Sequence, residues 1–144
     1  MADFKVTHEF ANYLGQGDVE LDAAGHSFRA ALTNVAPTQA GTTTLASVTQ
    51  IAATGGYTTV ALTGVTYTET GAGTGIWQFT SNAFSWTATA ANFDLARYIV
   101  IYDDTHPSDA VVGYLDYGSA FQVTEGNTLT ITPGANGIFR ITVS

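Results

Sequence analysis

Side chains that can bind metal or transfer protons gather in the stretch YIVIYDDTHPSDAVVGYLDYG, which begins at Tyr98. Asp103, Asp104 and Asp109 offer three carboxylates from one short segment, and His106 lies between them. Carboxylate oxygens are preferred ligands of calcium, so one interpretation of this segment is a calcium site.

The same segment also has the composition of a turn. DDTHPSD separates two apolar, β-rich runs and contains the Asp, Pro and Ser residues that favour turns. It lacks the spacing of a calcium-binding loop, and the adjacent Asp103 and Asp104 point to opposite faces of an extended backbone. A fourth carboxylate, Asp116, falls on the facing strand. We therefore predict a hairpin turn without a bound metal.

None of the polar groupings has the spacing of a catalytic site. His106, Ser108 and Asp109 are crowded into one turn, where a nucleophile, a base and an orienting acid cannot line up opposite an oxyanion pocket. His8 does not begin a zinc-protease motif, because position 12 is Asn, and we predict His26 in an exposed turn. The protein is therefore expected to have no enzymatic activity and no cofactor.

The Gly-rich stretch TGAGTGI, residues 70–76, resembles a phosphate-binding loop only in composition. Such loops follow a strand and open a helix, whereas this stretch runs into the strand-like IWQF. We predict a loop between two strands. Sugar binding by exposed tyrosines stays open as a separate possibility, with Tyr57, Tyr67, Tyr114 and Tyr117 as the candidates.

Charge and composition exclude several classes of partner. The net charge is −8, and the four basic residues are scattered singly along the chain, so a nucleic-acid-binding surface is not expected. No apolar run approaches the roughly 18 residues of a membrane span, and the first residues do not form a secretory signal. There is no Cys, which excludes disulfides and zinc-thiolate sites. We expect a protein made in the cytoplasm, with no membrane partner.

The order of local patterns predicts an all-β domain with one short helix. Apolar residues recur at helical spacing near the start of the chain, and Gly15 and Gly17 provide a stop, so residues 1–16 are predicted to contain an N-terminal helix. From residue 27 onward about nine short strand patterns follow one another, separated by turn residues. This pattern predicts an antiparallel, jelly-roll-like β-sandwich that forms a single domain over residues 1–144.

Residues 97–102 are predicted to lie in the middle of a sheet, because both faces of this strand are apolar. Trp77 with Phe79, and Phe84 with Trp86, form period-two pairs that we expect to be cross-strand neighbours. The predicted core consists of Trp77, Phe79, Phe84, Trp86, Ile99, Ile101, Leu129, Ile131, Phe139 and Ile141.

An ordered set of segments resembles a family of small virion proteins of tailed bacteriophages. The segments are EFANYLGQGDVELD, FRAALTNVAP, TLASVTQIAATGGY, AFSWTATAANF, ARYIVIYDDT, VVGYLDYGSAFQVTEGNTLTI and GIFRITVS, and together they cover nearly the whole chain.

This resemblance implies a capsid decoration (cement) protein on the outer surface of the mature head, where it stabilises capsomer junctions. The implied partners are the major capsid protein and two further copies in a homotrimer. The alternatives are another virion component (tail tube, head-tail adaptor or fibre base) or a carbohydrate-binding module. The candidate interface residues, on an apolar N-terminal stripe too short to be stable alone, are Phe4, Phe10, Tyr13 and Leu14.

Overall fold

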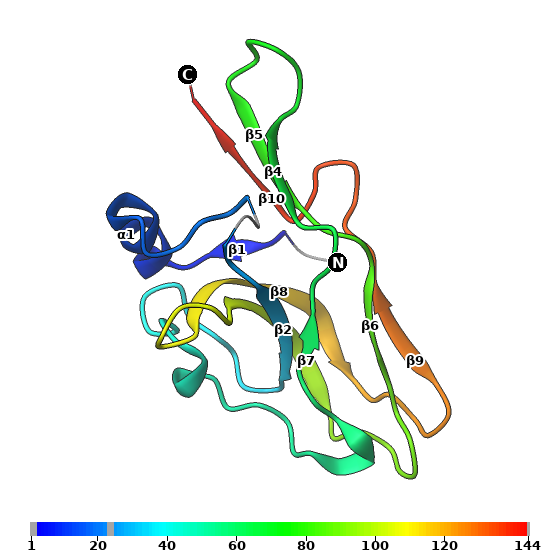
Figure 1. The fold of residues 1–144 in the computed structure, drawn as a ribbon. Helices are drawn as coiled ribbons and strands as arrows, with labels where there is room; N and C mark the ends of the chain where they lie inside the picture. The colour runs from blue at the N-terminus through cyan, green and yellow to red at the C-terminus, as the bar shows by residue number, and fades with distance from the viewer. Residues whose placement is uncertain (1–2, 23–24, 144) are drawn as a thin grey trace.

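The computed structural model describes residues 3–22 and 25–143, and most of its regular secondary structure consists of antiparallel strands (Figure 1). One α-helix, α1 (His8–Gln16), and two short 3₁₀ turns, η1 (Leu45–Ser47) and η2 (Thr54–Gly56), accompany them. The strands are β1 (Lys5–Val6), β2 (Phe28–Thr33), β3 (Val60–Ala61), β4 (Thr66–Glu69), β5 (Ile76–Thr80), β6 (Phe84–Thr87), β7 (Ala96–Asp103), β8 (Ala110–Phe121), β9 (Thr128–Ile131) and β10 (Phe139–Thr142). The predicted β-rich antiparallel fold with one short helix is confirmed.

Strand β7 lies in the middle of the largest sheet, whose order is β1-β8-β7-β2-β3. Ile99 and Ile101 face the main core, whereas Val100 and Tyr102 face a second apolar cluster on the other side of the sheet. Leu45, at η1 in the long connection between β2 and β3, packs against that second cluster. The prediction that residues 97–102 are covered on both faces is therefore confirmed.

The aromatic pairs of β5 and β6 are not cross-strand neighbours, so that prediction is wrong. Strand β5 lies between β10 and β4 in a three-stranded sheet, and β6 pairs with β9 in a separate ribbon. Phe79 and Phe84 nevertheless both reach the main core. The chain passes from one sheet to the other at residues 81–83 instead of folding back as a hairpin.

The helix is shorter than predicted, because the chain before it is extended. Residues Lys5–Val6 form β1 and pair with β8, and the helix begins only at His8. Its end matches the expected stop: Gly17 adopts a left-handed conformation with φ of 75°, and its N–H donates to the Leu14 carbonyl. Phe10 is buried and meets Phe139 edge to face, which anchors the helix to the core.

Most of the predicted core is buried, with one clear exception. Phe79, Phe84, Trp86, Ile99, Ile101, Ile131 and Phe139 are buried, and Leu129 and Ile141 are half-buried. Trp77 leaves 38% of its surface exposed, so its assignment to the core is wrong. The exposure arises because β5 extends beyond the layer that covers Phe79.

Candidate functional site

The Asp-rich stretch forms the turn between β7 and β8, as the hairpin interpretation predicted. The Asp109 N–H donates to the His106 carbonyl at 2.9 Å, and Asp109 takes a left-handed φ of 50° to close the turn. Within residues 3–22 and 25–143, no three His, Asp or Glu side chains come together as possible metal ligands. The turn therefore arranges its carboxylates separately and not around a common centre.

Asp103 is the one acidic residue of this turn that is fully buried, and its partner was not predicted. Its Oδ1 accepts the Thr105 N–H at 2.9 Å, and its Oδ2 contacts Nδ1 of His26. His26 is mostly buried, with 16% of its side chain exposed, so the prediction of an exposed turn histidine is wrong. The two residues are 77 positions apart, and nothing local in the sequence indicates their pairing.

Backbone hydrogen bonds hold the His26 segment against the turn. The Asp104 N–H donates to the Ser27 carbonyl, and the Ser27 N–H donates to Oγ1 of Thr105, both at 2.8 Å. A carboxylate that orients an imidazole is one half of a nucleophilic triad. In the described part of the chain, however, no Ser, Thr or Tyr hydroxyl bonds to the other ring nitrogen of His26. The pair therefore has a structural role: it joins the segment before β2 to the turn between β7 and β8.

The His106, Ser108 and Asp109 grouping does not form a hydrogen-bonded triad in the structure. The Ser108 backbone N–H, not its hydroxyl, donates to Nδ1 of His106 at 3.1 Å. The His106 ring also packs on Tyr13 of α1, with ring centres 4.8 Å apart. These contacts tie the turn to the helix and leave the imidazole without a bound nucleophile.

Two further carboxylates, those of Asp116 and Glu69, accept hydrogen bonds from groups of this chain. Asp116 accepts two hydrogen bonds from Arg97, each of 2.9 Å, and these bonds, with one from the Gly118 N–H, lower the pKa of Asp116 to about 2. In the Gly-rich loop between β4 and β5, the Glu69 carboxylate accepts the N–H groups of Gly73 and Gly75. These backbone N–H groups are the donors that a bound phosphate would need, and in this loop they are already bonded to Glu69.

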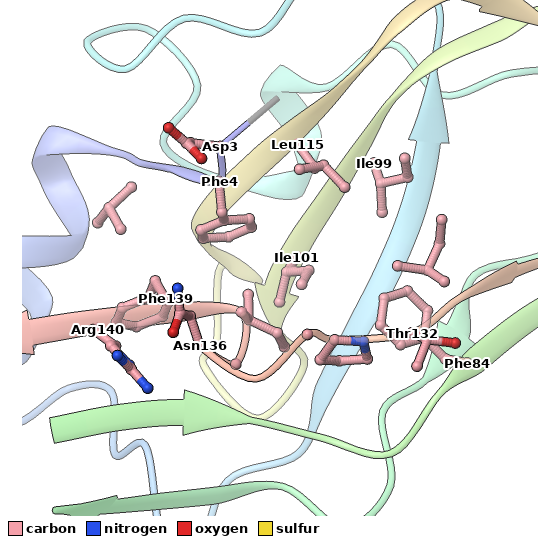
Figure 2. A pocket seen from close by; sticks show the side chains of 16 residues that line it. Asp3, Phe4, Phe84, Ile99, Ile101, Leu115, Thr132, Asn136, Phe139 and Arg140 are labelled. Atoms are coloured by element: carbon pink, nitrogen blue, oxygen red, sulfur yellow. The ribbon is translucent and has the colours of Figure 1, made fainter. Parts of the chain in front are cut away.

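An apolar cavity of about 450 Å³ lies between the large sheet and the connection from β9 to β10 (Figure 2). Ile99, Ile101 and Leu115 point into it from the sheet, Phe4 and Phe139 close one end, and Phe84 and Thr132 lie at the other. The charged ends of Asp3 and Arg140 point away from its middle. Ligand sites combine apolar walls with a few convergent polar groups. Here the polar side chains of Asn136 and Thr132 lie near opposite ends of the cavity and do not converge on one point.

The candidate interface residues pack mainly on their own chain. Phe10 is buried, and Phe4 stacks on Phe139 with ring centres 5.8 Å apart. Tyr13 and Leu14 are half-buried against the same core. The helical stripe is thus stabilised by docking on the strands, and Phe4, Tyr13 and Leu14 keep the exposed surface that an interface would use.

The four tyrosines considered for sugar binding fall into two groups. Tyr57 and Tyr114 are buried, and burial raises the pKa of the Tyr57 hydroxyl to about 12. Tyr67 is half-buried beside the exposed Trp77, with ring centres 5.5 Å apart, and Tyr117 is 40% exposed. The period-two spacing of Trp77 and Phe79 predicted that both are buried, so the exposure of Trp77 was not expected from the sequence.

No family model, curated protein or solved structure matches the chain. In the described part of the chain, none of the helices has the length and apolar character needed to cross a bilayer.

Proposed function

We propose that this protein is a bacteriophage capsid decoration (cement) protein, which binds the outer surface of the mature head and stabilises capsomer junctions. The observation that carries the proposal is the ordered set of segments that resembles small virion proteins. The main segments of that set coincide with strands of the fold: FRAALT is β2, ARYIVIYD is β7, AVVGYLDYGSAF is β8 and FRIT is β10. The proposed arrangement of these strands is a single jelly-roll-like sandwich, and the proposed assembly is a homotrimer.

The charge of the chain supports an outer location. A protein of net charge −8 with single, scattered basic residues has no electrostatic means of holding packaged DNA. Three of the basic side chains are also engaged within the chain, since Arg97 pairs with Asp116, Arg29 donates to Thr59 and Arg140 donates to Gln78. The proposed partner is therefore the major capsid protein and not the genome.

Trimer formation would strengthen a weak contact with the capsid. A single small protein offers a limited contact area, whereas three linked copies that bind three neighbouring capsid subunits gain avidity through effective concentration. The distance between neighbouring capsid subunits changes when a head expands. A trimer whose binding surfaces fit the expanded head therefore does not fit the unexpanded head.

The test is binding of purified protein to undecorated heads before and after expansion. We expect much tighter binding to expanded heads, with no competition from DNA. Tyr13→Ser and Leu14→Ser are the variants of choice, because truncating the N-terminus would also remove Phe10 from the core. Equal binding to both head forms, or displacement by DNA, would contradict the proposal and favour a tail tube, adaptor or fibre-base protein.

A further inference from the structure

The sheet β10-β5-β4 extends away from the rest of the molecule as an arm (Figure 1). One face of this arm continues the core. Phe79 pairs with Phe139 and Tyr67, and in the next row Trp77 pairs with Ile141. Because side chains alternate across a strand, Trp77 and Ile141 lie on the same face as the core residues Phe79 and Phe139.

This apolar face extends further than the layer that covers it. Phe79 is fully buried and Phe139 is 8% exposed, whereas Trp77 is 38% exposed and Val143 is 67% exposed. We call the uncovered part, made of Tyr67, Trp77, Ile141 and Val143, the arm face.

The opposite face of the arm is polar. Arg140 donates two hydrogen bonds to Oε1 of Gln78, and Thr68 pairs with Gln78 on the other side. A sheet that is covered on one side only has one apolar face and one polar face. The arm follows this pattern except at Glu69, which pairs with Trp77 on the apolar face, and at Ile76, which pairs with Thr142 on the polar face. Its own chain covers only the inner half of the apolar face.

Charge is segregated between the arm and the body of the molecule. Residues 64–92 and 127–144, which include every strand of the arm and of the β6-β9 ribbon, contain Glu69 and Arg140 as their only charged residues. These two charges cancel, so the net charge of −8 belongs to the remainder of the chain. Close approach of two copies through the surface outside these two stretches brings acidic groups together.

We propose that the arm face is the contact between copies of this chain, with the arms packed through Trp77 and Ile141. Such packing covers the apolar rows with matching apolar rows and leaves the acidic bodies outside the contact. Glu69 lies beside Trp77 on the same face, on the edge strand β4, where its carboxylate accepts the N–H groups of Gly73 and Gly75. An anionic partner such as DNA or an anionic membrane would meet a single basic residue on the arm, Arg140, which lies on the opposite face and donates to Gln78. The inference rests on the self-association in the proposed function and does not depend on binding to phage heads.

The test compares Trp77→Ser with Tyr117→Ser. Tyr117 is a matched control because it is an aromatic residue with nearly the same exposure, 40%, on β8 away from the arm. Native mass spectrometry and sedimentation of the wild-type chain should give a multiple of 15.1 kDa. Trp77→Ser should raise the dissociation constant by about 30-fold or more, as expected for a hot-spot aromatic residue, and Tyr117→Ser should leave it unchanged. Circular dichroism checks that both variants are folded.

A second measurement follows Trp77 directly. The chain has two Trp residues, and Trp86 is buried, so Trp86→Phe leaves Trp77 as the single reporter. Its emission should shift to longer wavelength as dilution separates the copies, and added salt should tighten association by screening the acidic bodies.

Three outcomes would overturn the inference. These are a wild-type chain that stays monomeric, an oligomer unaffected by Trp77→Ser, and an equal effect of Tyr117→Ser. A monomer whose Trp77 emission responds to a neutral oligosaccharide would assign the arm face to glycan binding instead. Because none of these measurements uses phage heads, failure here leaves the head-binding proposal standing.

Discussion

Removal of the His26 side chain should destabilise the protein by about 3 kcal/mol, because it leaves the Asp103 carboxylate buried with one hydrogen bond. Asp103 has no exposed surface, and its two partners are the Thr105 N–H and the His26 ring. Removing one hydrogen-bond partner of a buried polar group costs about 1–3 kcal/mol. We expect the upper end for His26→Ala, because the Asp103 side chain has no exposed surface through which water could replace the ring.

The assay is urea unfolding followed by the fluorescence of the buried Trp86. His8→Ala is the control, because His8 is exposed and its side chain has no hydrogen bond among the described contacts, so the change should stay within about 0.5 kcal/mol. His26→Asn restores a side-chain N–H near the carboxylate and should recover part of the loss. If His26→Ala were no more destabilising than His8→Ala, the structural role that we assign to the His26–Asp103 pair would be wrong.

Three further predictions follow from single contacts. Tyr57→Phe removes the hydroxyl oxygen that accepts the Leu32 N–H at 2.8 Å, and should lower the free energy of unfolding by about 1–3 kcal/mol in urea; an unchanged midpoint would contradict this. The pKa of Asp116 is lowered from 3.8 to about 2, so the stabilisation from its pairing with Arg97 is complete above pH 3.8 and is lost as the pH falls through 2. Asp116→Asn should therefore flatten the acid dependence of the melting temperature in that window, and an identical acid profile would refute the assignment. Ile101→Ala should cost about 2–5 kcal/mol by enlarging the apolar cavity that Ile101 lines, and a change below that range would show that the strand is not central to stability.

Local patterns predicted which faces are buried better than they predicted which strands pair. Strand β7 has apolar residues on both faces, and only a strand covered on both sides tolerates that pattern, so its central position followed from the sequence. The period-two pairs of β5 and β6 correctly indicated burial of Phe79, Phe84 and Trp86. They carried no information on pairing, because two strands of different sheets that face one core have the same alternation as two strands of one hairpin.

The contact between His26 and Asp103 could not be predicted for a related reason. Turn composition identifies a turn from neighbouring residues, and it placed the β7–β8 connection correctly. The partner of a buried carboxylate depends instead on which distant segment the topology brings alongside. Here the pairing of β2 with β7 sets Phe28 opposite Asp103, and this register carries the preceding residues of the chain to the turn.

The misplacement of Trp77 has a different cause, and it is the most informative one. Trp77 and Phe79 have the same alternation, the same aromatic character and the same strand, so no local pattern separates them. They differ in burial because the part of the chain that covers Phe79 does not extend over Trp77, and how far it extends depends on the whole fold. An apolar face that continues past this covering part satisfies its sequence pattern only when another surface covers it. The mismatch between pattern and burial at Trp77 is therefore an argument for a contact outside the single chain, and the absence of net charge on the arm makes a second acidic copy compatible with that position.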